Sequence, residues 1–214
     1  MIYDFPDENQ PLRQGDIFVG VPRIELSLAQ IPVIEESGEQ VVRAWDEIAR
    51  SGNAVTGIFA VRPVAAIVAS QDCDNLRSRD ITLCEIGKFR EVEKKSKETS
   101  SPKKWKDILT QHARINQKWF YLPKDMRVGF DDKMAVDFLV TLRLPRAELE
   151  TMRHLRRGRL NAVADEHFRE RISEFFRRYP YDEWYALDTD ELAAYQQEYP
   201  GTEPFPWQEP SKST

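Results

Sequence analysis

The sequence predicts an α+β protein, in which a small antiparallel β-barrel with inserted short helices is followed by a C-terminal helical segment. Short β-type runs between polar turns fill residues 16–86, and Met134–Leu144 alternates apolar and polar side chains as half-buried antiparallel strands do. Helical spacing begins after Leu144. We therefore expect a barrel domain over residues 1–144, a helical segment packed on it over 145–199, and a Pro-rich tail over 200–214.

The strands are predicted from apolar runs that lie between turn-forming residues. The run over residues 55–70 contains Pro63, so we expect two strands there, or one strand broken by a bulge. Because an open sheet edge attracts other strands, we expect the sheet to close into a barrel. The expected strands are Asp16–Val21, Ile24–Ile34, Val55–Val61, Val64–Ser70, Ile81–Ile86, Lys118–Leu122 and Met134–Leu144.

The helices are predicted from three- and four-residue spacing of apolar side chains and from breakers at their ends. Pro145 suits a first helical position and Gly158 a helix end, while Pro180 stops the next helix. The polar stretch Gln71–Arg79 is expected to be a loop. The expected helices are 40–50, a short amphipathic one near 102–109, 145–158, 161–179 and 190–199.

Composition and the N-terminus indicate a cytoplasmic protein. The chain has 214 residues and only two cysteines, which favours a reducing compartment over a disulfide scaffold. The N-terminal residues show no basic stretch followed by an apolar run, as a signal peptide would. The longest apolar stretch, Val64–Ala69, is far too short to span a bilayer, so we expect no membrane segment.

Charge is distributed in blocks along the chain. Residues 1–50 carry ten acidic and four basic residues, and 179–214 carry eight acidic and one basic. Between them, 88–106 carry eight basic and three acidic residues, and 143–178 carry ten basic and six acidic. Basic blocks of this kind indicate either a nucleic-acid footprint or contacts with oppositely charged segments of the same chain or of a second copy.

Three short motifs resemble the MazF/PemK family of toxin barrels. Gly15-Asp16-Ile17-Phe18 is similar to the family's opening strand, Arg62–Ser70 to its Arg-Pro-apolar strand, and Ile81–Ile86 to the strand that follows. The resemblance covers residues 14–87 and leaves out the C-terminal helices. It implies a metal-independent endoribonuclease, commonly a homodimer neutralised by an antitoxin.

The resemblance implies that Arg62 is the catalytic arginine, and a guanidinium fork suits a phosphate that gains negative charge. The alternative is a structural arginine that bonds loop carbonyls or an acid such as Asp16. The family's Gly-x-Glu-Gln-x-Gly loop is absent, and Cys84-Glu85-Ile86-Gly87 replaces its closing Thr or Ser. Cleavage therefore needs a second group for proton transfer, for which Asp72 and Glu85 are the candidates.

The cluster Gln71-Asp72-Cys73-Asp74-Asn75 has three interpretations. Cys73 could be a nucleophile that pairs with a distant histidine, His112, His154 or His167. Asp72, Cys73, Asp74 and Asp80 could hold a metal. The cluster could instead be a loop that caps its own backbone. Because paired Cys-x-x-Cys or spaced histidines are absent from the sequence, we predict no metal site and no cofactor.

Basic residues supply the candidate nucleic-acid contacts. Arg153, Arg156 and Arg157 would share one face of the expected helix, and Lys103 and Lys104 lie in the Lys-rich segment. The arginines could instead pair with the acidic tail, for example Asp188, Asp190 or Glu191. The sequence thus favours a barrel that binds or cleaves RNA. The alternative is a non-catalytic interaction module of a bacterial defence or toxin–antitoxin system, which binds a partner protein through its C-terminal helices.

Overall fold

The computed structural model describes residues 2–92, 101, 103, 118–177 and 189–201. The chain forms two compact units, Met1–Phe175 and Phe176–Thr214. The predicted α+β class is confirmed, as is the barrel-like antiparallel sheet with several short helices. The Lys-rich stretch beyond 92, the helix expected near 102–109 and the tail beyond 201 lie outside the described residues, apart from residues 101 and 103.

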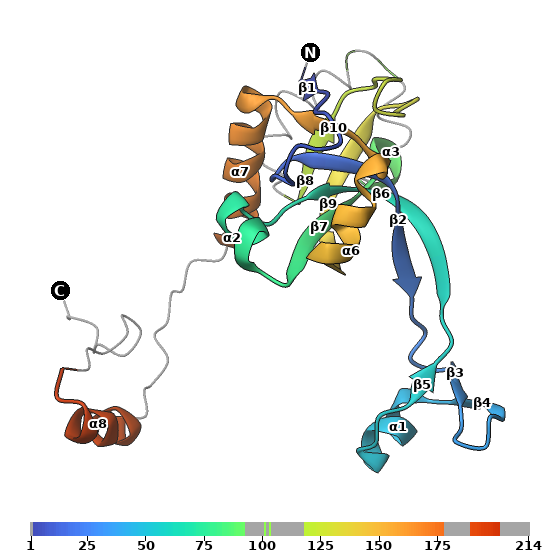
Figure 1. Cartoon of the computed structure of the whole chain (residues 1–214), viewed down its shortest axis with the longest axis vertical. Helices are drawn as coiled ribbons and strands as arrows, with labels where there is room; N and C mark the ends of the chain where they lie inside the picture. The colour runs from blue at the N-terminus through green and yellow to red at the C-terminus, as the bar shows by residue number, and fades with distance from the viewer. Residues whose placement is uncertain (1, 93–100, 102, 104–117, 178–188, 202–214) are drawn as a thin grey trace. The chain divides into compact units, whose positions relative to one another are not determined.

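Seven antiparallel strands form one curled sheet, a half-barrel (Figure 1). The edge strands β1 and β8 are each paired on one side only, so the expected closure is incomplete. The Tyr3 hydroxyl on β1 donates 2.8 Å to the carbonyl of Pro123, just past β8. In spatial order the strands are β1 (Tyr3–Asp4), β10 (Arg156–Leu160), β2 (Asp16–Glu25), β6 (Ala60–Val68), β7 (Asp80–Lys88), β9 (Met134–Pro145) and β8 (Trp119–Leu122).

Apolar clusters pack around the sheet and bring two helices onto it. Helix α7 (Ala162–Arg177) buries Phe168 and Phe175 against Phe138 of β9, with ring centroids 5.9 and 5.5 Å apart. Helix α6 (Arg146–Thr151) buries Leu149 in a second cluster with side chains of β2, β6 and β7. The predicted helix over 161–179 is therefore confirmed, since its apolar stripe is what fixes it to the sheet.

A small second sheet is inserted between β2 and β6. It contains β4 (Gln40–Arg43), β3 (Ile31–Ile34) and β5 (Thr56–Gly57) in that order, beside helix α1 (Trp45–Ser51). Its core is Ile31, Val33 and Ile48. The expected strand over 24–34 is thus interrupted, and the expected helix over 40–50 begins as a strand, because Gln40–Arg43 pairs with Ile31–Ile34.

Strands β2 and β6 form a long ribbon that carries Pro63 in its interior. Pro63 lies opposite Pro22, and neither residue has an N–H to lose from the ladder. Pairing of β6 with β7 begins only at Ala65, so Pro63 faces a partner strand on one side alone. The expected break therefore falls before the strand, at residues 58–59, and Pro63 is part of a continuous β6.

Two secondary-structure predictions were wrong. Residues 72–77 form a short helix, α2 (Asp72–Arg77), where a loop was expected, and the side chain of Asn75 fixes it by bonding Ser70. The helix expected over 145–158 ends at Thr151, continues as a 3₁₀ turn, η3 (Arg153–Leu155), and becomes strand β10. The sheet therefore takes a strand from beyond residue 144. The remaining described helices are α3 (Phe89–Val92) and α8 (Thr189–Glu198), the latter in the second unit.

Among the helices that the structure describes, none has the length and apolar character needed to cross a membrane.

Candidate functional site

The structure separates the four predicted catalytic residues into two groups, one around Arg62 and Glu85 and one in α2. Arg62 lies near the start of the strand and contacts Glu85, whereas Asp72 and Cys73 follow its end in α2. Six strand residues at about 3.3 Å each separate Arg62 from Val68, a distance of about 20 Å. Arg62 and the Gln71–Asn75 segment therefore do not share one end of the strand.

The first group is a charged cluster on the β2–β6–β7 surface, which we call the ribbon cluster. Arg62 donates from Nε to Glu25 at 2.6 Å and from a terminal nitrogen to Glu85 at 3.0 Å. Arg23, which pairs with Arg62 in the ladder, donates to the second oxygen of Glu85. The ribbon cluster thus has two guanidiniums and two carboxylates. Among the residues that the structure describes, neither a loop carbonyl nor Asp16, the alternative partners considered for Arg62, accepts a hydrogen bond from it.

The ribbon cluster is open to solvent at Arg62, whose side chain is 45% exposed, and more enclosed at Glu85, which is 15% exposed. The hydrogen bonds that Arg62 donates to Glu25 and Glu85 raise its pKa above the ordinary value, so its positive charge is permanent. The arrangement can place positive charge beside a carboxylate. These are the groups that metal-free phosphodiester cleavage needs for charge stabilisation and for proton removal.

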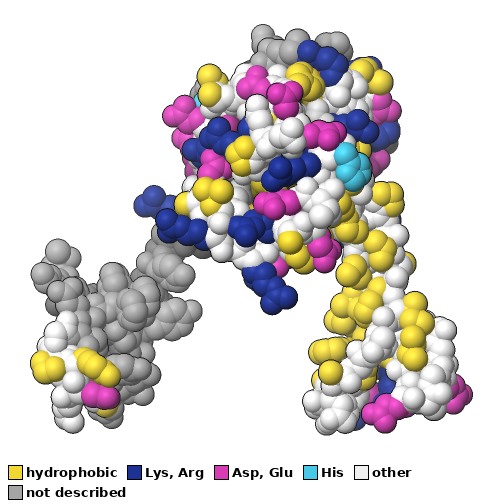
Figure 2. All heavy atoms as spheres, in the orientation of Figure 1, with side chains coloured by type: hydrophobic (Ala, Val, Ile, Leu, Met, Phe, Trp, Pro, Cys, Tyr) yellow, Lys and Arg dark blue, Asp and Glu magenta, His cyan; other side chains and the backbone are white. Residues whose placement is uncertain are grey.

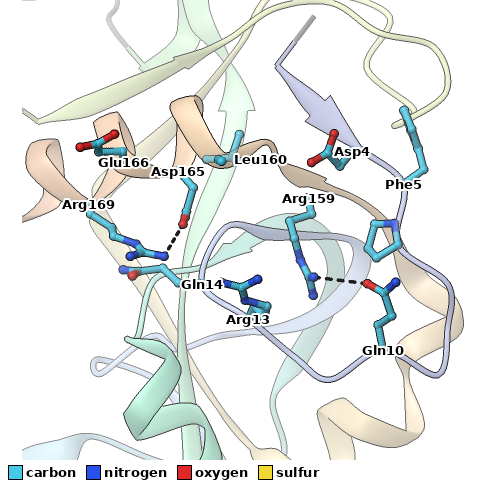
Figure 3. A pocket seen from close by; sticks show the side chains of 12 residues that line it. Asp4, Phe5, Gln10, Arg13, Gln14, Arg159, Leu160, Asp165, Glu166 and Arg169 are labelled. Atoms are coloured by element: carbon cyan, nitrogen blue, oxygen red, sulfur yellow. Dashed lines mark hydrogen bonds and ion pairs between the residues drawn. The ribbon is translucent and has the colours of Figure 1, made fainter.

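The second group borders a polar pocket of about 650 Å³ (Figure 3). Its walls come from β1 and the loop that follows it, from the end of β10, and from the first turns of α7. Three guanidiniums from distant parts of the sequence line it, those of Arg13, Arg159 and Arg169. The sequence analysis named none of the three as a site residue.

The base of the polar pocket is a buried ion network around Asp16. This fully buried carboxylate accepts from Arg156 at 3.2 Å and from Arg159 at 2.5 and 3.0 Å. The Arg156 guanidinium also donates to the carbonyls of Asp7, Glu8 and Pro11, and its side chain is 1% exposed. The structure therefore contradicts the assignment of Arg156 to nucleic-acid contacts, because its donors are sealed inside the fold.

Asp72 joins α2 to the polar pocket. Its carboxylate accepts from the backbone N–H of Gln14 at 2.7 Å and from Nε of Arg13 at 3.2 Å, and lies 3.9 Å from Arg169. Cys73 beside it is exposed. Cys84 is buried in the core, where burial raises the pKa of its thiol to about 12.

The alternative metal site at Asp72–Asp74 and Asp80 is not assembled. Asp80 pairs with Arg143 at 2.9 Å, and Asp72 is held by arginine. Across the described residues, three or more His, Cys, Asp or Glu side chains nowhere gather closely enough to hold a metal ion.

Asp165 is the buried acid of the polar pocket. It pairs with Arg169 one turn along α7, yet burial is the stronger influence and raises the pKa of the carboxyl group. Its Oδ1 has no hydrogen-bond partner among the described residues and packs against Gly15, where an added Cβ would come within 2.8 Å. Gly15 also has a φ of 83°, so two constraints favour glycine there. The sequence feature that could have indicated this site is the pair Gly15-Asp16, which we assigned only to the opening strand.

The remaining predicted nucleic-acid residues lie in different parts of the chain. Arg153 lies in η3 with Glu150 at 3.8 Å, Arg157 is an exposed residue of β10, and Lys103 is exposed. Lys104 lies outside the described residues. The proposed alternative partners Asp188, Asp190 and Glu191 belong to the second unit, and their side chains are not described.

Comparison of the chain with models of known protein families and with curated proteins finds no match.

Proposed function

We propose that the protein is an RNA-directed barrel of the MazF/PemK kind that binds RNA at the ribbon cluster and cleaves it without a metal. The observation that supports this is the 3.0 Å contact between Arg62 and Glu85. The two residues lie on different strands and were each named from the sequence for a different role. Arg23 adds a second guanidinium to the same carboxylate.

In this proposal Glu85 is the general base and the arginines stabilise charge. Glu85 takes the proton of a ribose 2′-hydroxyl, whose oxygen attacks the neighbouring phosphorus as the bond to the 5′-oxygen breaks. The leaving oxygen takes a proton from water. Arg62 and Arg23 face the phosphate and stabilise the negative charge that develops on its oxygens. The phosphate competes with Glu25 and Glu85 for the guanidiniums, so binding loosens the existing ion pairs.

The test is RNA cleavage by the folded protein, followed on labelled single-stranded RNA in the presence of a metal chelator. Arg62→Ala and Glu85→Gln should each lower the cleavage rate by about 100-fold or more, the range of a lost general base or charge-stabilising donor. Arg43→Ala is the matched control, because Arg43 forms a comparable half-exposed pair with Glu35 in the small sheet. Intact RNA after prolonged incubation, or equal loss in the control, would contradict the proposal.

The second candidate is the non-catalytic interaction module, and one observation favours it. Ten of the seventeen large hydrophobic side chains exposed in the described residues lie between residues 24 and 61. Figure 2 shows this part of the chain densely covered by hydrophobic side chains. Exposed apolar surface of this density is typical of protein-binding sites. This candidate therefore assigns partner binding to residues 24–61, and not to the C-terminal helices expected from the sequence.

This second candidate predicts a partner protein, or a second copy, that binds through the exposed hydrophobic side chains of residues 24–61, which include the inserted sheet. Replacing Leu26 and Leu28, which are each more than half exposed, with serine should abolish co-purification of the partner and leave thermal stability nearly unchanged. Sedimentation of the pure protein distinguishes the two cases, because a second copy would produce a dimer in the absence of any other protein. Retention of every partner by the double variant would contradict this role for residues 24–61.

A further inference from the structure

We infer that the polar pocket beside α7 is a binding site for a phosphate monoester of nucleotide size, held by Arg13 and Arg169. The inference concerns a site beyond the end of β6 that is farther from Arg62, and it does not depend on RNA cleavage at the ribbon cluster. It rests on the volume of the pocket, the convergence of its guanidiniums and the donors that two of them keep available.

The volume and the walls of the pocket suit a nucleotide. About 650 Å³ is within the range of small-molecule sites. Phe5, Pro6 and Leu160 supply apolar wall, and the Phe5 ring is fixed by the Arg127 guanidinium, 4.5 Å from its centroid. The pocket thus combines a charged region with an apolar region, as a ligand that carries both a phosphate and a base requires.

The guanidiniums converge on the pocket from three segments of the chain. Figure 3 shows Arg13 and Arg169 reaching toward the same space from the N-terminal loop and from α7. Helix α7 begins at Ala162, which itself lines the pocket, so the positive end of a sixteen-residue helix faces the same space. Each of these features attracts an anion.

The guanidiniums around this site form ion pairs with carboxylates. Arg156 and Arg159 share the single carboxylate of Asp16. Arg13 and Arg169 are balanced by Asp72 and Asp165, and the pKa of Asp165 is raised by burial. Asp4 and Glu166 add two exposed carboxylates to the wall of the pocket. A ligand anion would therefore be held by donors that Arg13 and Arg169 keep available, and not by an excess of positive charge.

Arg13 and Arg169 keep donors available for a ligand. The side-chain bond of Arg13 uses Nε, and both ion contacts of Arg169 use one terminal nitrogen, among the residues that the structure describes. The side chains are 51% and 48% exposed, so a ligand can reach them. A phosphate dianion can accept several donors at once from guanidinium forks. Arg159, by contrast, donates hydrogen bonds to Asp16, Gln10 and Pro11, and these bonds fix the pocket wall that it forms.

The experiment is calorimetric titration of the full chain with each of the four ribonucleoside 5′-monophosphates, with the matching nucleosides and with inorganic phosphate. A short RNA is added with and without a 5′-phosphate. At least one monophosphate should bind about tenfold or more tightly than its nucleoside and than inorganic phosphate. Tighter binding of the phosphorylated RNA would identify a strand end as the source, and tighter binding of the mononucleotide a free nucleotide.

Arg13→Ala and Arg169→Ala should each weaken the binding by about tenfold or more, since each removes charge-assisted hydrogen bonds. Arg43→Ala is the matched control, because Arg43 lies in the small sheet, is 39% exposed and does not line the pocket, and this variant should bind as the wild type does. Arg13 is half exposed, so its variant keeps the test valid if loss of Arg169 unfolds the protein. Arg62→Ala should leave this binding intact, which separates the inference from the proposed function.

Equal affinity for nucleoside and monophosphate would overturn the inference. So would unchanged affinity in a folded Arg13→Ala variant, or the absence of binding by every probe at millimolar concentration.

Discussion

Replacing Asp16 with asparagine tests whether the buried ion network holds the sheet together. Asp16 is fully buried at the start of β2 and is the shared partner of two arginines on β10. Asparagine keeps the shape of the side chain but removes its charge and turns one acceptor into a donor facing a guanidinium. Arg156, which is 1% exposed, is then left as a buried charge without a carboxylate.

The expected loss is about 3–5 kcal/mol, the range for breaking one side of a buried ion pair, which corresponds to a fall in Tm of about 6–20 °C in a domain of this size. The assay is urea denaturation followed by circular dichroism, with thermal unfolding as a second measurement. Asp80→Asn is the control, because its partner Arg143 is 76% exposed and such pairs contribute about 0–1 kcal/mol. A loss from Asp16→Asn no larger than that of the control would refute the reasoning.

Two further predictions concern a titrating acid and the two thiols. Because the pKa of Asp165 is raised, the native state holds the proton of this carboxyl group more tightly than the unfolded chain does. Loss of that proton therefore lowers the free energy of unfolding as the pH rises from the ordinary pKa of 3.8 through the pKa in the folded state. Asp165→Asn should therefore gain stability relative to wild type across that interval, measured by urea denaturation against pH; a difference independent of pH would contradict this. A thiol reagent should label exposed Cys73 in the native protein and Cys84 only after denaturation, as counted by mass spectrometry. Two labels in the native state, or none, would contradict the burial of one thiol or the exposure of the other.

Most strands could be predicted because their apolar patterns match the sheet that forms. The alternation in Met134–Leu144 predicts a strand, and the strand in the structure is longer by one residue, Pro145. The segment 146–160 could not be predicted in the same way, because its apolar spacing fits a helix. What makes 156–160 a strand is tertiary: Arg159 lies opposite Asp16 in the ladder, and two buried arginines satisfy that carboxylate. Local spacing carries no information about a partner 143 residues away.

The candidate sites show the same division between local and distant information. Arg62 and Glu85 could be named from short motifs, and their contact follows from the pairing of neighbouring strands. The polar pocket could not be named, since its guanidiniums come from residues 13, 159 and 169 and each alone is an ordinary arginine in the sequence. Only the fold brings them together, and only burial explains why Arg156 is structural while Arg169, whose side chain is 48% exposed, can meet a ligand.

The length of β6 decides how the two sites relate. Its nine residues carry Arg62 near one end and lead into α2 at the other, and Pro63 remains within the strand because it pairs with β2 alone at that point. At about 3.3 Å per residue, neither arginine of the ribbon cluster can reach a phosphate bound at Arg13 and Arg169. An RNA strand that binds both sites would span them with a few extended nucleotides. A strand with its phosphorylated end in the polar pocket would then place an internal phosphate at Arg62, and cleavage would fall at a fixed distance from that end. Uniform cleavage along a 5′-phosphorylated RNA would show that the two sites act independently.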